Sequence, residues 1–183
     1  ANTTATDQVA IGHEALDAAT TGSENTAVGK SALSALTEGV QNTALGGYTL
    51  LADTTGSRNV SIGYQSMIAN TTGHGNVAIG QCALNANTDQ NDSVAIGHCA
   101  LDANTCPNQT AVGAYALQLN TTGTNNVAVG MGSLDANTTG DSNVAVGGQS
   151  LGANTTADGN TAVGYQSLDA NTTGFNNTAV GNC

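Results

Sequence analysis

Short apolar stretches recur along the chain at an almost constant spacing. Each consists of Val or Thr, then Ala or Ser, then Val, Ile or Leu, and it ends at a Gly, as in Val77–Gly80. This alternation of β-branched and small residues predicts a short β-strand. The motif glycines are Gly12, Gly29, Gly46, Gly63, Gly80, Gly97, Gly113, Gly130, Gly147, Gly164 and Gly181. They are 17 residues apart, except for an interval of 16 between Gly97 and Gly113, which predicts a repeat protein.

A second apolar position lies four residues after each motif glycine. It is Leu in nine of ten copies and Met67 in the tenth, and the residue before it is Ala, Ser or Thr. We interpret this stretch, for example Gln166–Ala170, as a second short strand. The segments between the strands, such as Asn137–Gly140, carry Asn-Thr-Thr-Gly, and these residue types favour a turn. The motif glycines predict another turn, with a positive φ or a close backbone approach.

A unit of two short strands and two turns cannot bury its apolar side chains alone, so neighbouring units must stack. The sequence therefore predicts an all-β fold, a β-solenoid or parallel β-roll of eleven coils of about 17 residues. We expect a single domain over residues 1–183, with one coil centred on each motif glycine. At about 4.8 Å per coil, the rod is roughly 50 Å long.

Stacking in register places like residues in rows along the rod. We predict a core of two facing rows, one of Val and Ile and one of Leu: Ile11, Val28, Ile62, Ile79, Ile96, Val129, Val146 and Val163, and Leu16, Leu33, Leu84, Leu101, Leu134 and Leu168. An asparagine row is expected to form amide ladders: Asn25, Asn42, Asn59, Asn76, Asn126, Asn143, Asn160 and Asn177. The small residue at each strand centre points the other way, which suits either a tight internal bend or contact with a second chain.

The composition excludes several classes of partner. The net charge is −11 with only two cations, Lys30 and Arg58, which argues against nucleic acid and anionic membranes as partners. No apolar run approaches the roughly 18 residues of a membrane span, so no membrane insertion is expected. Because the chain begins at Ala1 without a recognisable signal peptide, we interpret it as a processed or excised segment. Four cysteines and very little lysine favour an extracellular location.

No cluster of chemistry-bearing residues stands out from the repeat. His13 and His98 share a row but lie five coils apart, about 24 Å, so they cannot share a metal ion within one chain. The acidic row is interrupted by uncharged residues, which favours solvated carboxylates over a Ca²⁺ site; it consists of Asp17, Asp102, Asp135 and Asp169. We therefore expect no enzyme activity, no metal and no cofactor.

The cysteines and the glycosylation sequons remain as candidate covalent sites. Cys82 and Cys99 lie one coil apart in one row, within disulfide reach, while Cys106 is the rival partner of Cys99. Cys183 ends the same row and could link subunits. The sequons that we expect in exposed turns are Asn2, Asn70, Asn120, Asn137, Asn154 and Asn171, with others at Asn91, Asn108 and Asn176.

The repeat resembles a known family. Asn76–Gly80, Ser93–Gly97 and Asn160–Gly164 resemble the head repeats of trimeric autotransporter adhesins, and phage tail-fibre-like proteins contain similar repeats. The resemblance spans essentially the whole chain, although the turn here is longer and no neck, stalk or anchor is visible. It implies a left-handed parallel β-roll, usually trimeric, on a cell surface or a virion appendage. Such heads commonly bind matrix proteins, other cells or host receptors.

Three functions are consistent with these patterns. The first is a structural subunit or shaft of an extracellular fibre, with copies stacking end to end into a filament, or a segment of a longer shaft. The second is an adhesin or phage receptor-binding head, which would bind through Tyr64, Tyr165, His74 and Phe175. The third is an ice-binding protein, because Thr pairs such as Thr71-Thr72 repeat regularly. The expected partners are further copies of the chain and, for a head, a host receptor or matrix protein.

Overall fold

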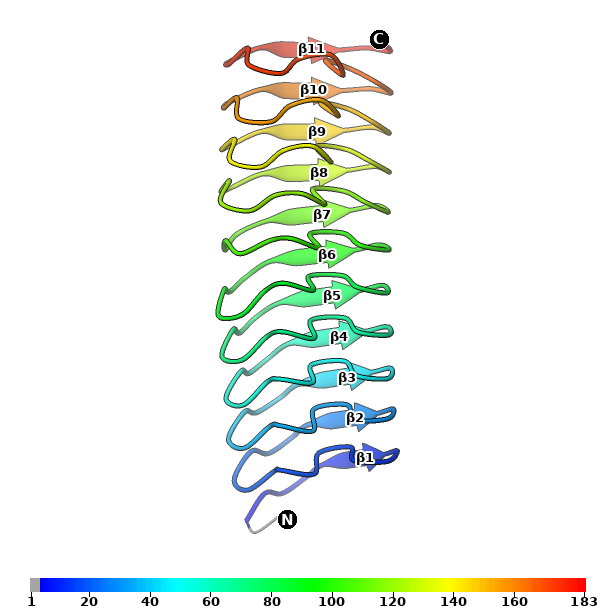
Figure 1. Ribbon diagram of the computed structural model, residues 1–183, viewed down its shortest axis with the longest axis vertical. Coiled ribbons are helices and arrows are strands. Elements are labelled where there is room, and N and C mark those ends of the chain that lie inside the picture. Colours follow the sequence, from blue (N-terminus) through cyan, green and yellow to red (C-terminus); the bar gives the residue numbers. More distant parts are fainter. Residues whose placement is uncertain (1–3) are drawn as a thin grey trace.

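The computed structural model describes residues 4–183 as a straight β-solenoid (Figure 1). Eleven parallel three-residue strands form one sheet in chain order. The strands are β1 (Val9–Ile11), β2 (Thr26–Val28), β3 (Thr43–Leu45), β4 (Val60–Ile62), β5 (Val77–Ile79), β6 (Val94–Ile96), β7 (Thr110–Val112), β8 (Val127–Val129), β9 (Val144–Val146), β10 (Thr161–Val163) and β11 (Thr178–Val180). The predicted all-β solenoid with a spacing of about 17 residues is therefore confirmed. Nothing in the described chain is a helix long and apolar enough to cross a membrane.

The register of the sheet follows the repeat without a slip. Like positions pair along the whole rod, as in Ile79 with Ile96. The connection between β6 and β7 is one residue shorter, yet Ile96 still pairs with Val112. The missing residue is absorbed in the turn, where the Thr105 hydroxyl still donates to the Thr121 carbonyl at 2.8 Å. A single deletion in a turn thus leaves the rows intact.

The stretch predicted to be a second strand is a series of turns, and that prediction is wrong. Gln166 and Leu168 have φ values of 54° and 51°, in the left-handed region that an extended strand does not visit. Hydrogen bonds between coils persist without extended backbone, because Leu151 N–H donates to the Ser167 carbonyl at 3.0 Å. Leu and Met residues adopt this conformation in every complete coil.

The core lies on the opposite side of the strands from the side that we predicted. In a three-residue strand the middle side chain points one way and its two neighbours point the other. Ala or Ser at the strand centre faces inward and is fully buried in β2 to β10. The predicted row of Val and Ile lies on the outer surface, from partly exposed Val28 and Ile79 to Ile11, which is 60% exposed. That correction applies to Ile11, Val28, Ile62, Ile79, Ile96, Val129, Val146 and Val163.

The interior is too thin for branched side chains on both walls. The central alanines face the leucine row. Of the leucines predicted in that row, Leu168 near the last coil is partly buried, and the others are buried as predicted: Leu16, Leu33, Leu84, Leu101 and Leu134. Between these rows, small hydroxyl groups bond directly to strand backbone, as from Ser150 to the Ala162 carbonyl at 3.1 Å. The small strand-centre residues therefore line a tight interior and not a contact with a second chain.

Two buried asparagine rows run along the rod. In the predicted row, Asn42 Nδ2 donates to Asn25 Oδ1 at 3.1 Å, and Asn42 N–H donates to the same oxygen. The second row was not predicted: there Asn137 Nδ2 donates to Asn120 Oδ1 at 2.9 Å and to the Gly140 carbonyl at 3.0 Å. These amides satisfy turn backbone that the narrow interior would otherwise leave without hydrogen bonds.

The motif glycines combine both properties expected of them. Gly113 has a φ of 138°, and a Cβ there would lie 2.5 Å from the carbonyl carbon and oxygen of Gly130 in the next coil. A side chain at this corner would therefore meet the neighbouring backbone, and the corner closes only with Gly.

Candidate interaction surface

The outer side chains of the sheet form one broad surface, which we call the sheet face. One row holds six Val and five Thr: Val9, Thr26, Thr43, Val60, Val77, Val94, Thr110, Val127, Val144, Thr161 and Thr178. The other row is wholly apolar: Ile11, Val28, Leu45, Ile62, Ile79, Ile96, Val112, Val129, Val146, Val163 and Val180. No charged side chain stands in either row. Strands β1 to β11 stack as one parallel sheet in chain order, so both rows run the length of the rod (Figure 1).

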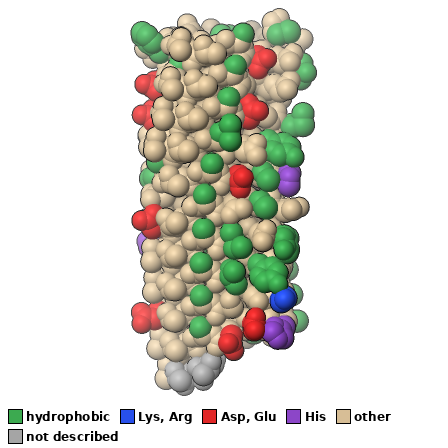
Figure 2. All heavy atoms as spheres, in the orientation of Figure 1, with side chains coloured by type: hydrophobic (Ala, Val, Ile, Leu, Met, Phe, Trp, Pro, Cys, Tyr) green, Lys and Arg blue, Asp and Glu red, His purple; other side chains and the backbone are tan. Residues whose placement is uncertain are grey.

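The opposite broad face is different in character. Figure 2 shows that face, where acidic side chains and a narrow row of hydrophobic ones lie among uncharged polar side chains. It carries the acidic row, in which burial raises the pKa of the Asp102 and Asp135 carboxyls. Within residues 4–183 no three or more His, Cys, Asp and Glu side chains are placed to hold a metal ion. The contrast makes the sheet face the distinctive surface of the rod.

The edge at the carboxyl ends of the strands carries the most varied side chains. These follow the motif glycines by one or two residues. Tyr48 and Tyr64 meet edge to face with ring centroids 5.8 Å apart, and Lys30 Nζ lies 5.2 Å from the Tyr48 centroid. His98 and Tyr115 make a similar contact at 5.2 Å. We call this the strand-end edge, and it is the part of the repeat where sequence differences reach solvent.

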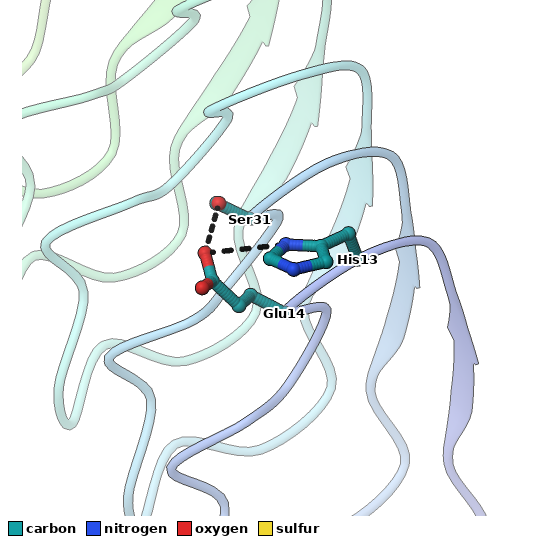
Figure 3. A network of polar contacts seen from close by, with 3 residues as sticks. All are labelled: His13, Glu14 and Ser31. Atoms are coloured by element: carbon teal, nitrogen blue, oxygen red, sulfur yellow. Dashed lines mark hydrogen bonds and ion pairs between the residues drawn. The ribbon is translucent and has the colours of Figure 1, made fainter.

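The strand-end edge also carries a polar link between the first two coils (Figure 3). Glu14 accepts a hydrogen bond from the Ser31 hydroxyl at 3.0 Å, and its carboxylate lies 3.5 Å from His13 Nδ1. His13 is 72% exposed and His98 belongs to a separate aromatic contact, so the structure does not bring the two histidines together. The Glu14 side chain therefore links the first two coils, and the His13 side chain contacts Glu14 within its own coil.

The Thr pairs lie at the opposite edge, in the turns. The first Thr of a stacked pair uses its hydroxyl within the rod, as from Thr54 to the Thr71 carbonyl and from Thr121 to the Thr138 carbonyl, both at 3.0 Å. The second Thr, such as Thr139, is exposed. Half of the hydroxyls proposed for ice contact thus serve the coil itself.

Most of the predicted glycosylation sites lie inside the rod, which corrects their expected exposure. Asn70, Asn120, Asn137 and Asn154 are fully buried. Asn171 is half-buried and donates to the Gly174 carbonyl at 2.8 Å. Since the amide nitrogen that would carry a glycan is hydrogen-bonded within the coil, the folded rod cannot accept one at these residues. Asn2 lies outside the described residues.

The four cysteines are free thiols in the structure, so neither predicted disulfide is present. Cys99 lies against His98, with Sγ 3.5 Å from Nε2. Burial raises the pKa of the Cys99 and Cys106 thiols, which keeps them protonated and disfavours reaction as thiolates. Cys183 is exposed, and a link through it to another subunit stays a prediction.

Sequence reasoning missed one buried ionisable group, Asp53. It occupies the second asparagine row between Leu36 and Asn70, where Oδ1 accepts from Gly56 N–H at 2.8 Å and Oδ2 has no hydrogen-bond partner. Burial raises the pKa of this carboxyl to about 7. The signal was available, because Asp53 is the one acidic residue at a position that is otherwise Asn in most coils.

Comparison with protein-family models, curated proteins and solved structures finds no match to this chain. The structure itself defines the class, a parallel β-solenoid repeat protein. Any more specific conclusion depends on its surfaces.

Proposed function

We propose that the chain is a structural subunit or shaft of an extracellular fibre, which extends by stacking coil upon coil. The observation that carries the proposal is the unbroken register of one sheet over eleven strands. Side chains of one kind run the length of the rod in rows, and no loop within residues 4–183 is enlarged to present a binding site. Such a rod supplies length and stiffness, as expected of a shaft.

The backbone of every coil has two complementary edges. Toward the next coil, Thr161 N–H donates to the Asn177 carbonyl at 2.8 Å, and the Val163 carbonyl accepts from Gly181 N–H at 2.8 Å. By this pattern, Thr178 N–H and the Val180 carbonyl point away from β10 toward the position of a further coil. At the opposite end, the Gln8 carbonyl and Gly12 N–H point away from β2. These groups form matching pairs, so one rod can continue on another as a head-to-tail filament.

Electron microscopy of the purified chain tests the proposal. We expect filaments many times longer than a single rod of roughly 50 Å. Thr178→Pro removes the donor at the last strand and places a ring where the next coil would pack, so it should leave single rods. Thr178→Ala keeps the N–H and should still form filaments. Uniform short rods from the unaltered chain, or filaments from the proline variant, would contradict the proposal.

The strand-end edge supports a second candidate, an adhesin or receptor-binding head. Tyr64, Tyr115 and Tyr165 are 50%, 41% and 54% exposed on this edge, and Phe175 in a turn is 70% exposed. Exposed aromatic side chains are common anchors in recognition surfaces. This is the role that the resemblance to trimeric autotransporter adhesin heads implies. Binding of isolated rods to matrix proteins or host cells, lost on Tyr64→Ser and Tyr165→Ser together, would favour it over a shaft.

A further inference from the structure

We infer that the sheet face is covered by the sheet face of a second copy of this chain, so that two rods pair side by side. The inference concerns the flank of the rod and does not depend on end-to-end stacking. It starts from the strands, where the small side chains are buried and the larger apolar side chains face outward. Ala or Ser points into the coil, while larger Val, Ile and Leu side chains point outward.

A parallel sheet of this composition is normally covered on both sides. Strands that are apolar at successive positions are typical of sheets buried on both faces. Here the inner face is covered by the leucine row, and the outer face has no cover within the described chain. Ile62, Ile96 and Val129 in the middle of the rod are each 36% exposed.

The size of the sheet face suits a pair of rods. Eleven coils and two side-chain rows give a strip of about 50 Å by 12 Å, or roughly 600 Å². Apart from five Thr the strip is apolar, and apolar patches of more than about 400 Å² are uncommon on a soluble monomer unless they bind something. A standard complex buries about 800 Å² per partner, so two faces in full contact approach that area.

Charge and spacing both point to another copy as the occupant. Two chains that each carry a net charge of −11 can approach at this face without burying a charged side chain. The outer rows repeat with the coil spacing over the full length of the rod, and a second copy offers the same spacing. Sheets packed face to face lie about 10 Å apart with their side chains interdigitated. Because the face is one continuous sheet of parallel strands, the sheet face of one other copy can cover it along its whole length.

Sedimentation velocity of the Thr178→Pro variant tests pairing separately from filament growth. We expect a dimer, with twice the mass of the chain. Replacing Ile62, Ile96 and Val129 together by Lys places cations in the contact, and it should raise the dimer dissociation constant at least about a hundredfold. The matched control replaces three exposed turn residues, Thr72, Thr122 and Thr139, each by Lys, and should remain a dimer.

Each outcome decides the matter. Loss of the dimer in the sheet-face variant alone, with the far-UV circular dichroism spectrum of the rod retained, supports pairing. A monomer or a trimer before substitution, a dimer that survives the sheet-face lysines, or equal loss in the control overturns it. Should the triple variant fail to fold, Val129→Lys alone should raise the dissociation constant about tenfold, and an unchanged constant would overturn the inference.

Discussion

Asp53 is the most deeply buried of the carboxyl groups whose pKa is raised, and it makes the stability of the rod depend on pH. Burial raises its pKa to about 7 from an ordinary value of 3.8. Between these values the folded chain holds a proton that the unfolded chain has released, so the free energy of unfolding falls as pH rises. The stability that the protonated Asp53 carboxyl allows is fully present below about pH 4 and is lost as pH rises through about 7. We expect Asp53→Asn to stabilise the rod by about 2 kcal/mol at pH 8, measured by urea unfolding from about pH 4 to about pH 8.

The asparagine variant also completes a row. Asn70 Nδ2 donates to the Gly73 carbonyl three residues on, and an amide at position 53 can donate to the Gly56 carbonyl in the same way, whereas the carboxylate leaves Oδ2 without a partner. Glu38→Gln is the matched control, because it removes an exposed carboxylate from the neighbouring coil and should keep the pH dependence of the parent chain. A parent chain whose stability is flat from pH 4 to 7 would refute this role for Asp53.

At the scale of the element, the coil depends on leucines in the left-handed region. Leu134 has a φ of 52° and is fully buried. A β-branched residue is strongly disfavoured there, and Val would also leave a cavity. We expect Leu134→Val to lower the free energy of unfolding by about 2–3 kcal/mol in urea titrations. Leu134→Met should cost less than about 1.5 kcal/mol, since Met67 already occupies the equivalent position. Equal losses in the two variants would show that backbone conformation is not the cause.

These leucines also show what the sequence could predict about each element. The spacing of the motif glycines was sufficient for the strands and their register, because stacked coils must align equivalent positions. It was not sufficient for the connecting stretch, since Leu is not a residue that signals left-handed backbone. One clue was present: the position is Leu or Met in every complete coil and never Val, Ile or Thr. Exclusion of β-branched residues from a buried position argues against a strand.

At the scale of the whole molecule, the inner face of the strands could not be read from alternation alone. Val77, Ala78 and Ile79 alternate equally well with either face inward. Hydrophobicity favours burial of the larger side chains, Val77 and Ile79. The interior of a coil is too narrow for them, so Ala78 faces inward. The same thin interior buries the second asparagine row, so sequons that look like exposed turns lie in the core. The surface that remains distinctive, the sheet face, therefore became visible only with the structure.

A rod held together by nearest-neighbour contacts should tolerate the loss of one whole coil. Deleting residues 131–147 joins Gly130 to Gly148, which keeps every row in register. We expect this variant to keep its far-UV circular dichroism spectrum and to unfold in urea with a slope about one tenth smaller, because less surface is exposed on unfolding. Deleting residues 131–139 removes about half a coil, places turn residues opposite strand residues, and should split or abolish the cooperative transition. If the whole-coil deletion unfolds the chain as completely as the half-coil deletion, stability does not reside in stacked and interchangeable coils.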